Sequence, residues 1–394
     1  MALQLHTDYS AFGGRNLFYG KTKFIQFRYL KESIRVVKEP KDDDKSISSF
    51  QALMVSTASR VGTGNIAGIS TALCIGGPGA MFWMWLTALL GSASAFVEST
   101  LAQIYKKRAD DGSSYGGPAY YIQAVLKKRW IGILFAVVLI VTYMGGFNMV
   151  AAFNIADTFK AYSFYDASMT PKIVGGVLAI AFLICIFGGG KQISKVTGVL
   201  VPVMGVFLYR SFTVHRYYTY QPCSRHDCRY RKGAFDFKAI FGGFAGSAIM
   251  QGIKRGLFSN EAGVGSAPNA AASAGVSHPA KQGLVQMLSV YIDTIVICTA
   301  TAFMLLCSGV EPSKEIAGMS YVQAAVANSL GGFGTIFITV ALCLFAFTTL
   351  IGNFYYAEMG LGYICNKTPG STLIMHSVFS RQSLSASALR WNSA

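Results

Sequence analysis

Long runs of residues without a single charge constrain this chain more than any other feature. Residues 131–153, 173–188 and 333–357 contain no Asp, Glu, Lys or Arg, and residues 284–309 contain only Asp293. A bilayer core about 30 Å thick is crossed by roughly 20 apolar residues in a helix. Only 13% of all residues are charged, about half the usual share in soluble domains. We therefore predict an all-α protein with several membrane-spanning helices.

The formal net charge of +16 is explained mainly by loops and does not indicate a nucleic-acid surface. Basic residues fill short loops at 106–108, 127–129 and 191–195, which is typical of cytoplasmic loops, and the acidic loop 311–315 then falls outside. The eight cysteines stand mostly alone inside spans and indicate no disulfide framework. No nucleophile–base set, HExxH or Walker sequence is found. We expect no enzyme activity, no cofactor and no nucleic-acid partner.

Two apolar segments are interrupted by glycine and polar residues at corresponding places. Residues 48–75 are interrupted at 60–65, and residues 240–274 are interrupted at 255–263. Such a pair of broken helices points to an inverted-repeat transporter. A helix broken inside the membrane exposes N–H groups at one half-helix start and carbonyls at the other half-helix end. The N–H end attracts a carboxylate and the carbonyl end attracts a cation, so we predict that the two breaks lie side by side.

Three carboxylates lie inside these spans, where an ionised group is costly unless it is paired or faces water. For Glu98, near one end of its span, we favour structural pairing. For Glu261, inside the second break, we favour a role in the pocket or a gate, with pairing to Arg255 or Arg60 as the alternative. For Asp293 both interpretations, gate and pairing, remain open.

Several strings resemble the alanine or glycine:cation symporter family. They are Gly-Thr-Gly-Asn-Ile-Ala-Gly at 62–68, Gly-Gly-Pro-Gly-Ala-Met-Phe-Trp-Met-Trp at 76–85, Gly-Gly-Pro-Ala-Tyr-Tyr at 116–121 and, most specific, Lys-Arg-Gly-Leu-Phe-Ser-Asn-Glu-Ala-Gly-Val-Gly-Ser-Ala-Pro at 254–268. The resemblance covers about residues 23–209 and 233–360. It implies a leucine-transporter-like fold of five-plus-five inverted repeats, here with about eight of ten core helices, and Na⁺-driven (sometimes H⁺-driven) uptake of alanine, glycine or similar amino acids.

The resemblance also implies a site. The substrate would be bound by Gly62, Thr63, Gly64, Asn65, Asn154, Phe258, Ser259, Asn260 and Gly263. The amides of Thr63 and Gly64 would receive the substrate carboxylate, and Asn154 is the one candidate on the third core helix for the amide side chain found in the family's alanine carriers. Na⁺, the coupling ion, would be bound by the carbonyls of Ala58 and Val61 and the hydroxyls of Thr348 and Thr349, because Na⁺ prefers hard oxygen ligands.

Three segments do not fit this resemblance. We divide the chain into a non-family segment at 1–22, a first repeat at 23–209, an anomalous basic segment at 210–232, part of a second repeat at 233–365 and an anomalous tail at 366–394. Frameshifts in the gene are the simplest explanation for the three odd segments, and a genuine insertion is the alternative. Two functions remain open: a multi-pass symporter of a bacterial inner membrane, and a non-transporting remnant of one.

Overall fold

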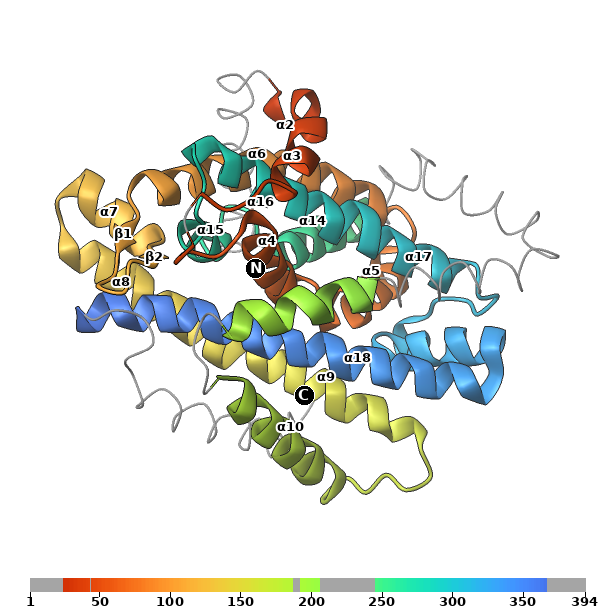
Figure 1. Ribbon diagram of the computed structural model, residues 1–394. Helices are drawn as coiled ribbons and strands as arrows, with labels where there is room; N and C mark the ends of the chain where they lie inside the picture. Colours follow the sequence, from red (N-terminus) through yellow and green to blue (C-terminus); the bar gives the residue numbers. More distant parts are fainter. Residues whose placement is uncertain (1–23, 43, 187–191, 206–244, 367–394) are drawn as a thin grey trace.

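The computed structural model describes residues 24–42, 44–186, 192–205 and 245–366, and most of these residues are helical (Figure 1). The helices are α2 (Ile25–Arg28), α3 (Leu30–Val37), α4 (Ser49–Arg60), η1 (Thr63–Asn65), α5 (Ala67–Gly76), α6 (Ala80–Ile104), α7 (Pro118–Leu126), α8 (Arg129–Ile140), η2 (Val141–Phe147), α9 (Asn148–Thr158), η3 (Phe159–Ala161), α10 (Thr170–Ile186), 192–205, α14 (Ala245–Asn260), α15 (Ala267–Ala272), α16 (Pro279–Val290), η4 (Tyr291–Cys298), α17 (Thr299–Leu306), η5 (Lys314–Ile316) and α18 (Met319–Cys365). The strands β1 (Lys107–Arg108) and β2 (Ser114–Tyr115) form an antiparallel hairpin. The anomalous segments at 1–22 and 210–232 lie outside the described residues, as do residues 367–394 of the tail.

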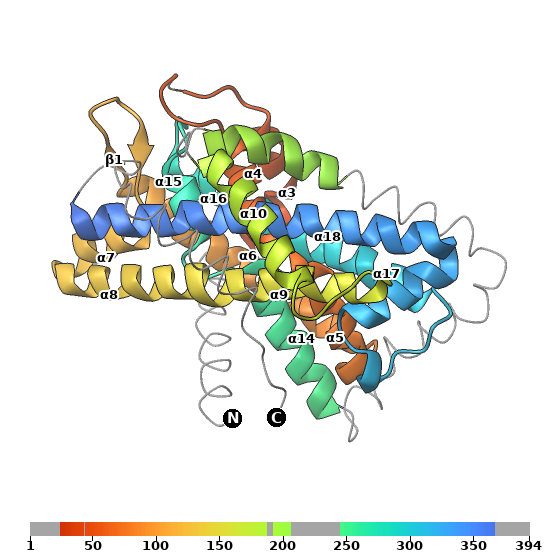
Figure 2. The same ribbon diagram turned by 90° about the horizontal axis from the view of Figure 1, so that it is seen from below.

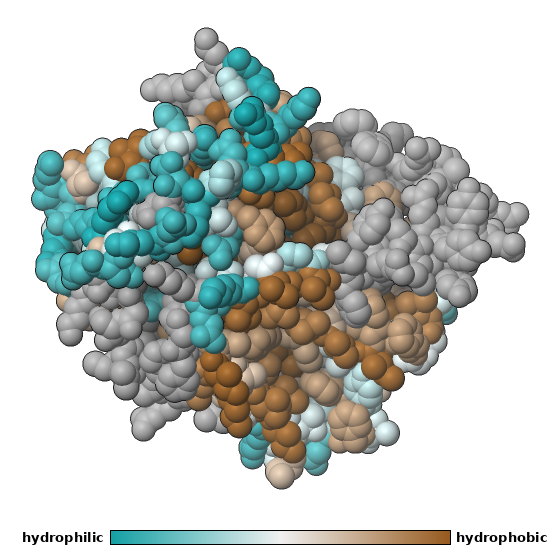
Figure 3. Space-filling view, in the orientation of Figure 1, coloured by the Kyte–Doolittle hydropathy of each residue, from teal (hydrophilic) through white to brown (hydrophobic). Residues whose placement is uncertain are grey.

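Four continuous helical stretches of the described chain are long and apolar enough to cross a membrane: Ala80–Ile104, Arg129–Ala161, Pro279–Leu306 and Met319–Cys365. A shorter apolar helix covers Thr170–Cys185. Side chains such as Val138 on α8 and Ile180 on α10 are large, hydrophobic and exposed. Figures 2 and 3 show α10 on the outside of the bundle, where the surface is strongly hydrophobic. The expected all-α membrane architecture is therefore confirmed.

The first broken helix begins with a capping box. The Ser48 hydroxyl accepts a hydrogen bond from the Gln51 N–H at 3.1 Å, and the Gln51 side chain accepts one from the Ser48 N–H at 2.9 Å. These reciprocal bonds satisfy donors that a helix start leaves open. The helix α4 then runs to Arg60, and α5 resumes the same segment after the short turn η1.

Two boundaries differ from the sequence-based expectations. The second interruption was expected at 255–263, but α14 stays helical to Asn260 and the chain opens at Glu261, whose φ is 48°. Gly263 and Gly265 follow with φ of 82° and 90°, a conformation that glycine adopts at little cost. The last uncharged run begins at residue 333, but α18 begins at Met319 and is kinked at Gly331, with φ 61° and ψ −152°.

The basic loops gather at one end of the bundle. Lys281 at the start of α16 forms an ion pair with Glu39, just after α3, at 2.6 Å. Lys106 Nζ donates to the Ala274 carbonyl at 3.1 Å, and Arg129 donates to the Ile364 carbonyl at 3.3 Å. The Asp42 N–H, after α3, donates to the Gly275 carbonyl next to Ala274, so the chain that follows α3 lies beside the basic loop at 106–108.

Helices α14 and α6 approach so closely that they need glycine at the contact. A Cβ at Gly252 would overlap the Ala80 carbonyl oxygen, and one at Gly256 would overlap the Thr87 hydroxyl. Small residues of this kind let membrane helices pack backbone to backbone.

We predict that Gly252→Ala lowers stability by about 1–3 kcal/mol, because the backbone at Ala80 cannot yield without separating the helices. Gly176→Ala is the matched control, since the described part of the chain leaves open space around Gly176 and alanine favours a helix. Thermal unfolding in detergent checks both variants. An equal melting temperature for Gly252→Ala and the parent would contradict the packing argument.

Candidate functional site

The two broken helices meet in the interior. The Asn65 side chain, in the first break, donates to the Ser259 hydroxyl, beside the second break, at 3.2 Å. A Cβ at Gly64 would lie 3.2 Å from the ring of Phe258. The predicted juxtaposition of residues 62–65 with residues 258–263 is therefore confirmed.

Within the described part of the chain, two backbone N–H groups at the first break have no hydrogen-bond acceptor. The Gly62 N–H donates to Asn65 Oδ1 at 3.0 Å, instead of continuing the α4 ladder to the carbonyl of Ala58. Thr63 and Gly64 open the turn η1, and the first N–H groups of a helical turn have no acceptor within it. Both residues line a small cavity. This end of the break therefore offers N–H donors to an anion.

The second break is different, because the protein supplies its own anion there. Glu98 on α6 accepts hydrogen bonds from the Gly263 N–H through Oε1 and from the Gly265 N–H through Oε2, both at 3.1 Å. One carboxylate thus satisfies two backbone donors that face the same way, an arrangement that binds anions well. Glu98 has the structural role expected of it, although its partners are backbone amides.

Asp293 joins both breaks to the helix segment η4. Its Oδ1 accepts from Asn65 Nδ2 at 2.7 Å, and its Oδ2 accepts from the hydroxyls of Ser259 at 2.7 Å and Thr294 at 2.9 Å. The Asp293 side chain is fully buried. A carboxylate with three such donors is well satisfied in the interior. Of the two interpretations of Asp293, this geometry supports structural pairing.

Glu261 has a different set of neighbours. Its Oε2 accepts from the Tyr143 hydroxyl at 2.9 Å and from the Ser266 hydroxyl at 2.7 Å. Arg60 lines the same cavity and attracts Glu261 electrostatically, while Nη1 of Arg60 donates to the Ser289 hydroxyl at 2.8 Å. Arg255 instead lies against Gly68 of α5. The suggested pairing of Glu261 with Arg255 is therefore wrong, whereas Arg60 is an electrostatic neighbour.

The cavity between the breaks has a volume of about 20 Å³, enough for one water-sized particle. Three aromatic rings are stacked beside it. The Phe147 ring is in the middle of the stack. Its centroid lies 4.7 Å from that of Phe258 and 4.9 Å from that of Tyr143. The residues lining the cavity are Ser59, Arg60, Gly62, Thr63, Gly64, Phe147, Val150, Phe258, Ser259, Glu261 and Thr349.

The residues expected to bind sodium lie near the first break. Ala58 and Val61 are buried at the end of α4. A Cβ at Gly62 would overlap the Thr349 hydroxyl, so Thr349 lies directly beside the break. The hydroxyls of Thr348 and Thr349 both donate to the Phe345 carbonyl at 2.9 Å, and Thr348 also faces Met204 Sδ at 3.6 Å. Both hydroxyls keep lone pairs for a cation.

The other expected site residues support the breaks from outside the cavity. Asn154 Nδ2 donates to the Thr63 hydroxyl at 3.1 Å. Asn260 Oδ1 accepts from the Ala262 N–H at 3.1 Å, and Gly263 is bound by Glu98. Sequence reasoning missed the cavity residues Ser59, Phe147 and Val150 and the hydrogen bond from Tyr143. The Gly-Gly-Phe string at 145–147, inside an apolar span, was a signal of irregular structure there.

Comparison with known proteins decides the family. A sequence profile of the sodium:alanine symporter family matches residues 12–392. The chain belongs to the sodium:alanine symporter family. Membership makes it a multi-pass membrane transporter and not an enzyme. The matched range includes residues 210–232 and most of the tail, whose origin as frameshift products stays a prediction.

Individual members of the sodium:alanine symporter family are similar over most of the chain. The amino-acid carrier protein AlsT of Bacillus subtilis (strain 168) is 46% identical over 355 residues, which cover 89% of this chain and 74% of that protein. The probable sodium/glutamine symporter GlnT of the same strain is 45% identical, covering 88% and 72%. The sodium/alanine symporter AgcS of Methanococcus maripaludis is 39% identical, covering 86% and 75%.

Proposed function

We propose that the chain is a sodium-coupled symporter of small neutral amino acids, of the alanine or glycine type, that works by alternating access in a bacterial inner membrane. The five-plus-five inverted-repeat fold is part of this proposal. The names of the relatives, which include an amino-acid carrier and sodium/alanine and sodium/glutamine symporters, support the substrate class and the ion.

The observation that carries the proposal is the difference between the two breaks. At the second break, Glu98 already occupies the N–H groups of Gly263 and Gly265. At the first break, Thr63 and Gly64 line the cavity and begin the turn η1, and the first N–H groups of such a turn have no acceptor within it. A substrate carboxylate therefore has one place to bind, at the first break. The Glu261 carboxylate lines the same cavity and provides a partner for the substrate ammonium, so the site suits a zwitterion.

Cavity size limits the substrate side chain. The stacked rings of Phe147 and Phe258 stand beside a space of only about 20 Å³. Even alanine or glycine requires some of these side chains to move, and a larger side chain requires more movement. Small amino acids therefore have the lowest reorganisation cost in this pocket.

The test is uptake of labelled alanine, glycine and glutamine by proteoliposomes that contain this chain, with an inward sodium gradient or with potassium in its place. We expect sodium-dependent uptake of alanine or glycine that exceeds uptake of glutamine. A companion protein carries the corresponding residues of AlsT in place of 210–232. Uptake by the companion alone would favour the remnant hypothesis for this chain, and sodium-independent uptake by both would contradict the coupling.

Thr349 offers a direct test of the ion site. We predict that Thr349→Val raises the sodium concentration for half-maximal alanine binding about tenfold, equivalent to about 1.4 kcal/mol, because valine keeps the shape and removes the hydroxyl. Thr348→Val should act in the same direction. Thr339→Val is a comparison variant on the same helix, where the Thr339 hydroxyl donates one turn back to the Thr335 carbonyl and accepts from the Tyr162 hydroxyl. Unchanged sodium dependence in both test variants would remove these threonines from the ion site.

A further inference from the structure

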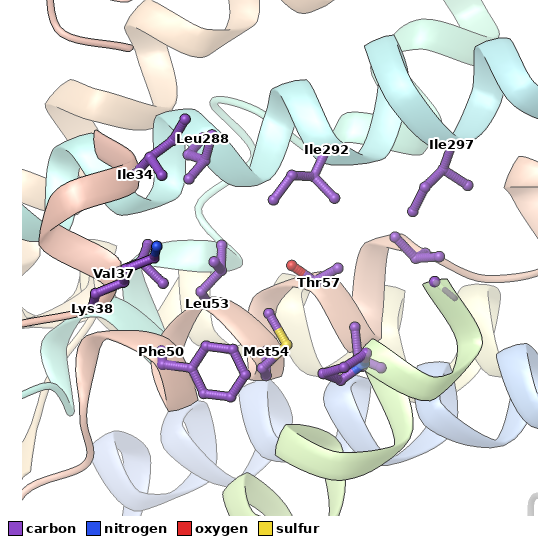
Figure 4. Close-up of a pocket in the computed structure, with 14 residues that line it drawn as sticks. Ile34, Val37, Lys38, Phe50, Leu53, Met54, Thr57, Leu288, Ile292 and Ile297 are labelled. Atoms are coloured by element: carbon purple, nitrogen blue, oxygen red, sulfur yellow. The ribbon is translucent and has the colours of Figure 1, made fainter. Parts of the chain in front are cut away.

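A second and much larger cavity lies beside α4, on the side of the basic loops. Its volume is about 480 Å³, within the range of ligand-binding pockets. Among the residues that the structure describes, Lys38 and Thr57 are the polar side chains in its lining, and the others are apolar or glycine. The lining residues are Ile34, Val37, Lys38, Phe50, Leu53, Met54, Thr57, Val61, Val201, Pro202, Gly205, Leu288, Ile292 and Ile297 (Figure 4).

The cavity is extended along α4, because residues from the start to the end of this helix line it. It follows one face of α4, from Phe50 in the first turn to Val61 at the end. Eleven residues of helix span about 16 Å. This shape suits one extended hydrocarbon chain and does not suit a compact polar ligand.

Positive charge lies at one end of the cavity. Figure 4 shows Lys38 at the end opposite Ile297. Lys31 and Lys38 are both exposed, and neither forms an ion pair within the part of the chain that the structure describes. Figure 3 shows hydrophobic surface directly below the hydrophilic α2–α3 segment. The segment α3 therefore lies where a membrane surface meets its apolar interior, as amphipathic surface helices do.

We propose that this cavity binds one acyl chain of an anionic phospholipid, with the lipid phosphate at Lys38. The basic loops place this end on the cytoplasmic side by the positive-inside tendency, where the leaflet is rich in anionic lipid. Burial of an alkyl chain against Leu53, Ile292 and their neighbours supplies the affinity, and Lys38 selects the headgroup charge.

The inner end of the lipid chain would reach the transport site. Thr57 and Val61 line this end of the cavity, and Val61 is the cap residue that directly follows α4 at the first break. A bound acyl chain would therefore pack against α4 and stabilise its observed position. Loss of the lipid would leave that face of α4 uncovered. Lipid occupancy and the conformation of the first break are thus linked.

Native mass spectrometry of the detergent-solubilised chain tests the proposal without requiring transport. The protein is equilibrated with equal amounts of phosphatidylglycerol and phosphatidylcholine that carry identical acyl chains. We expect one tightly retained phosphatidylglycerol, not displaced by millimolar inorganic phosphate. Equal retention of the two lipids would overturn the role of Lys38, and displacement by phosphate would show an anion site without a lipid chain.

Two variants separate the headgroup from the chain. Ile292→Phe fills the cavity and should reduce retention of both lipids at least tenfold, whereas Val138→Phe, on the exposed face of α8, should not. Lys38→Glu is a surface change compatible with folding and should abolish the preference for phosphatidylglycerol, whereas Lys314→Glu, in η5, should keep it. Undiminished retention in a folded Ile292→Phe variant, or an unchanged preference in Lys38→Glu, would overturn the proposal.

Discussion

Asp293→Ala is expected to destabilise the protein by about 2–4 kcal/mol and to abolish measurable alanine binding. The substitution leaves the Asn65 amide and the Ser259 hydroxyl without their carboxylate acceptor in a buried place, and each orphaned group costs about 1–3 kcal/mol. Part of this loss is offset because the buried carboxylate no longer has to be desolvated. Asn65 also holds the Gly62 N–H, so its displacement would deform the amide end of the first break.

Thermal unfolding and sodium-dependent binding of labelled alanine check this expectation, with two comparison variants. Asp293→Asn keeps an acceptor oxygen for Asn65 and should retain most of the stability. Thr301→Val removes a buried hydroxyl from the same continuous helix, where it bonds only one turn back to Ile297 in the described structure. If Asp293→Ala has the same melting temperature as Thr301→Val and still binds alanine, Asp293 does not hold the two broken helices in place.

Gly62→Ala is expected to weaken sodium-dependent alanine binding by at least about tenfold, or 1.4 kcal/mol, with a smaller effect on folding. The added Cβ would overlap the Thr349 hydroxyl. The backbone of Gly62 has φ −137° and ψ −154°, so the substitution acts mainly through this overlap and not through a left-handed φ. Either Thr349 rotates away or the break shifts, and both movements disturb the proposed ion site.

Gly146→Ala is the control for this variant, because Gly146 lies in η2 near the site while a Cβ there meets open space in the described structure. The measurement is the sodium concentration for half-maximal alanine binding, together with the alanine dissociation constant at saturating sodium. If both values are the same for Gly62→Ala and Gly146→Ala, Thr349 does not take part in sodium binding.

Much of the fold was predictable from the sequence, because the membrane imposes simple rules. Uncharged runs identified the long spans, and the glycine-rich string at 62–68 identified the first break. The second break was harder to locate. Polar residues at 255–260 suggested an early interruption. Arg255 however lies against α5, Ser259 bonds to Asp293 of η4, and the helix ends only where left-handed backbone begins at Glu261.

The support of the site was less predictable. A carboxylate on α6 that binds the amides of the second break depends on a contact between residues about 165 positions apart, and nothing local marks Glu98 for that role. The start of α18 was missed because residues 319–330 are only moderately apolar and Gly331 separates them from the main span. Asn154, in contrast, was implied by the family resemblance as the amide side chain of the third core helix, and it does contact Thr63.

Two helices at the site contain π-helical segments, η2 at Val141–Phe147 and η4 at Tyr291–Cys298. A π turn holds one more residue than an α turn, and each residue of an α-helix turns the chain by about 100°. If one residue after Asp293 but inside η4 is deleted, the π-helical turn can become an ordinary α-helical turn. The side chains of α17 then keep their orientation relative to those of α16. The same deletion within α17 would rotate every later side chain of that helix by about 100° relative to Asp293. The tolerance of this family to single-residue length changes should therefore be concentrated in these two short stretches, next to the small cavity between the breaks.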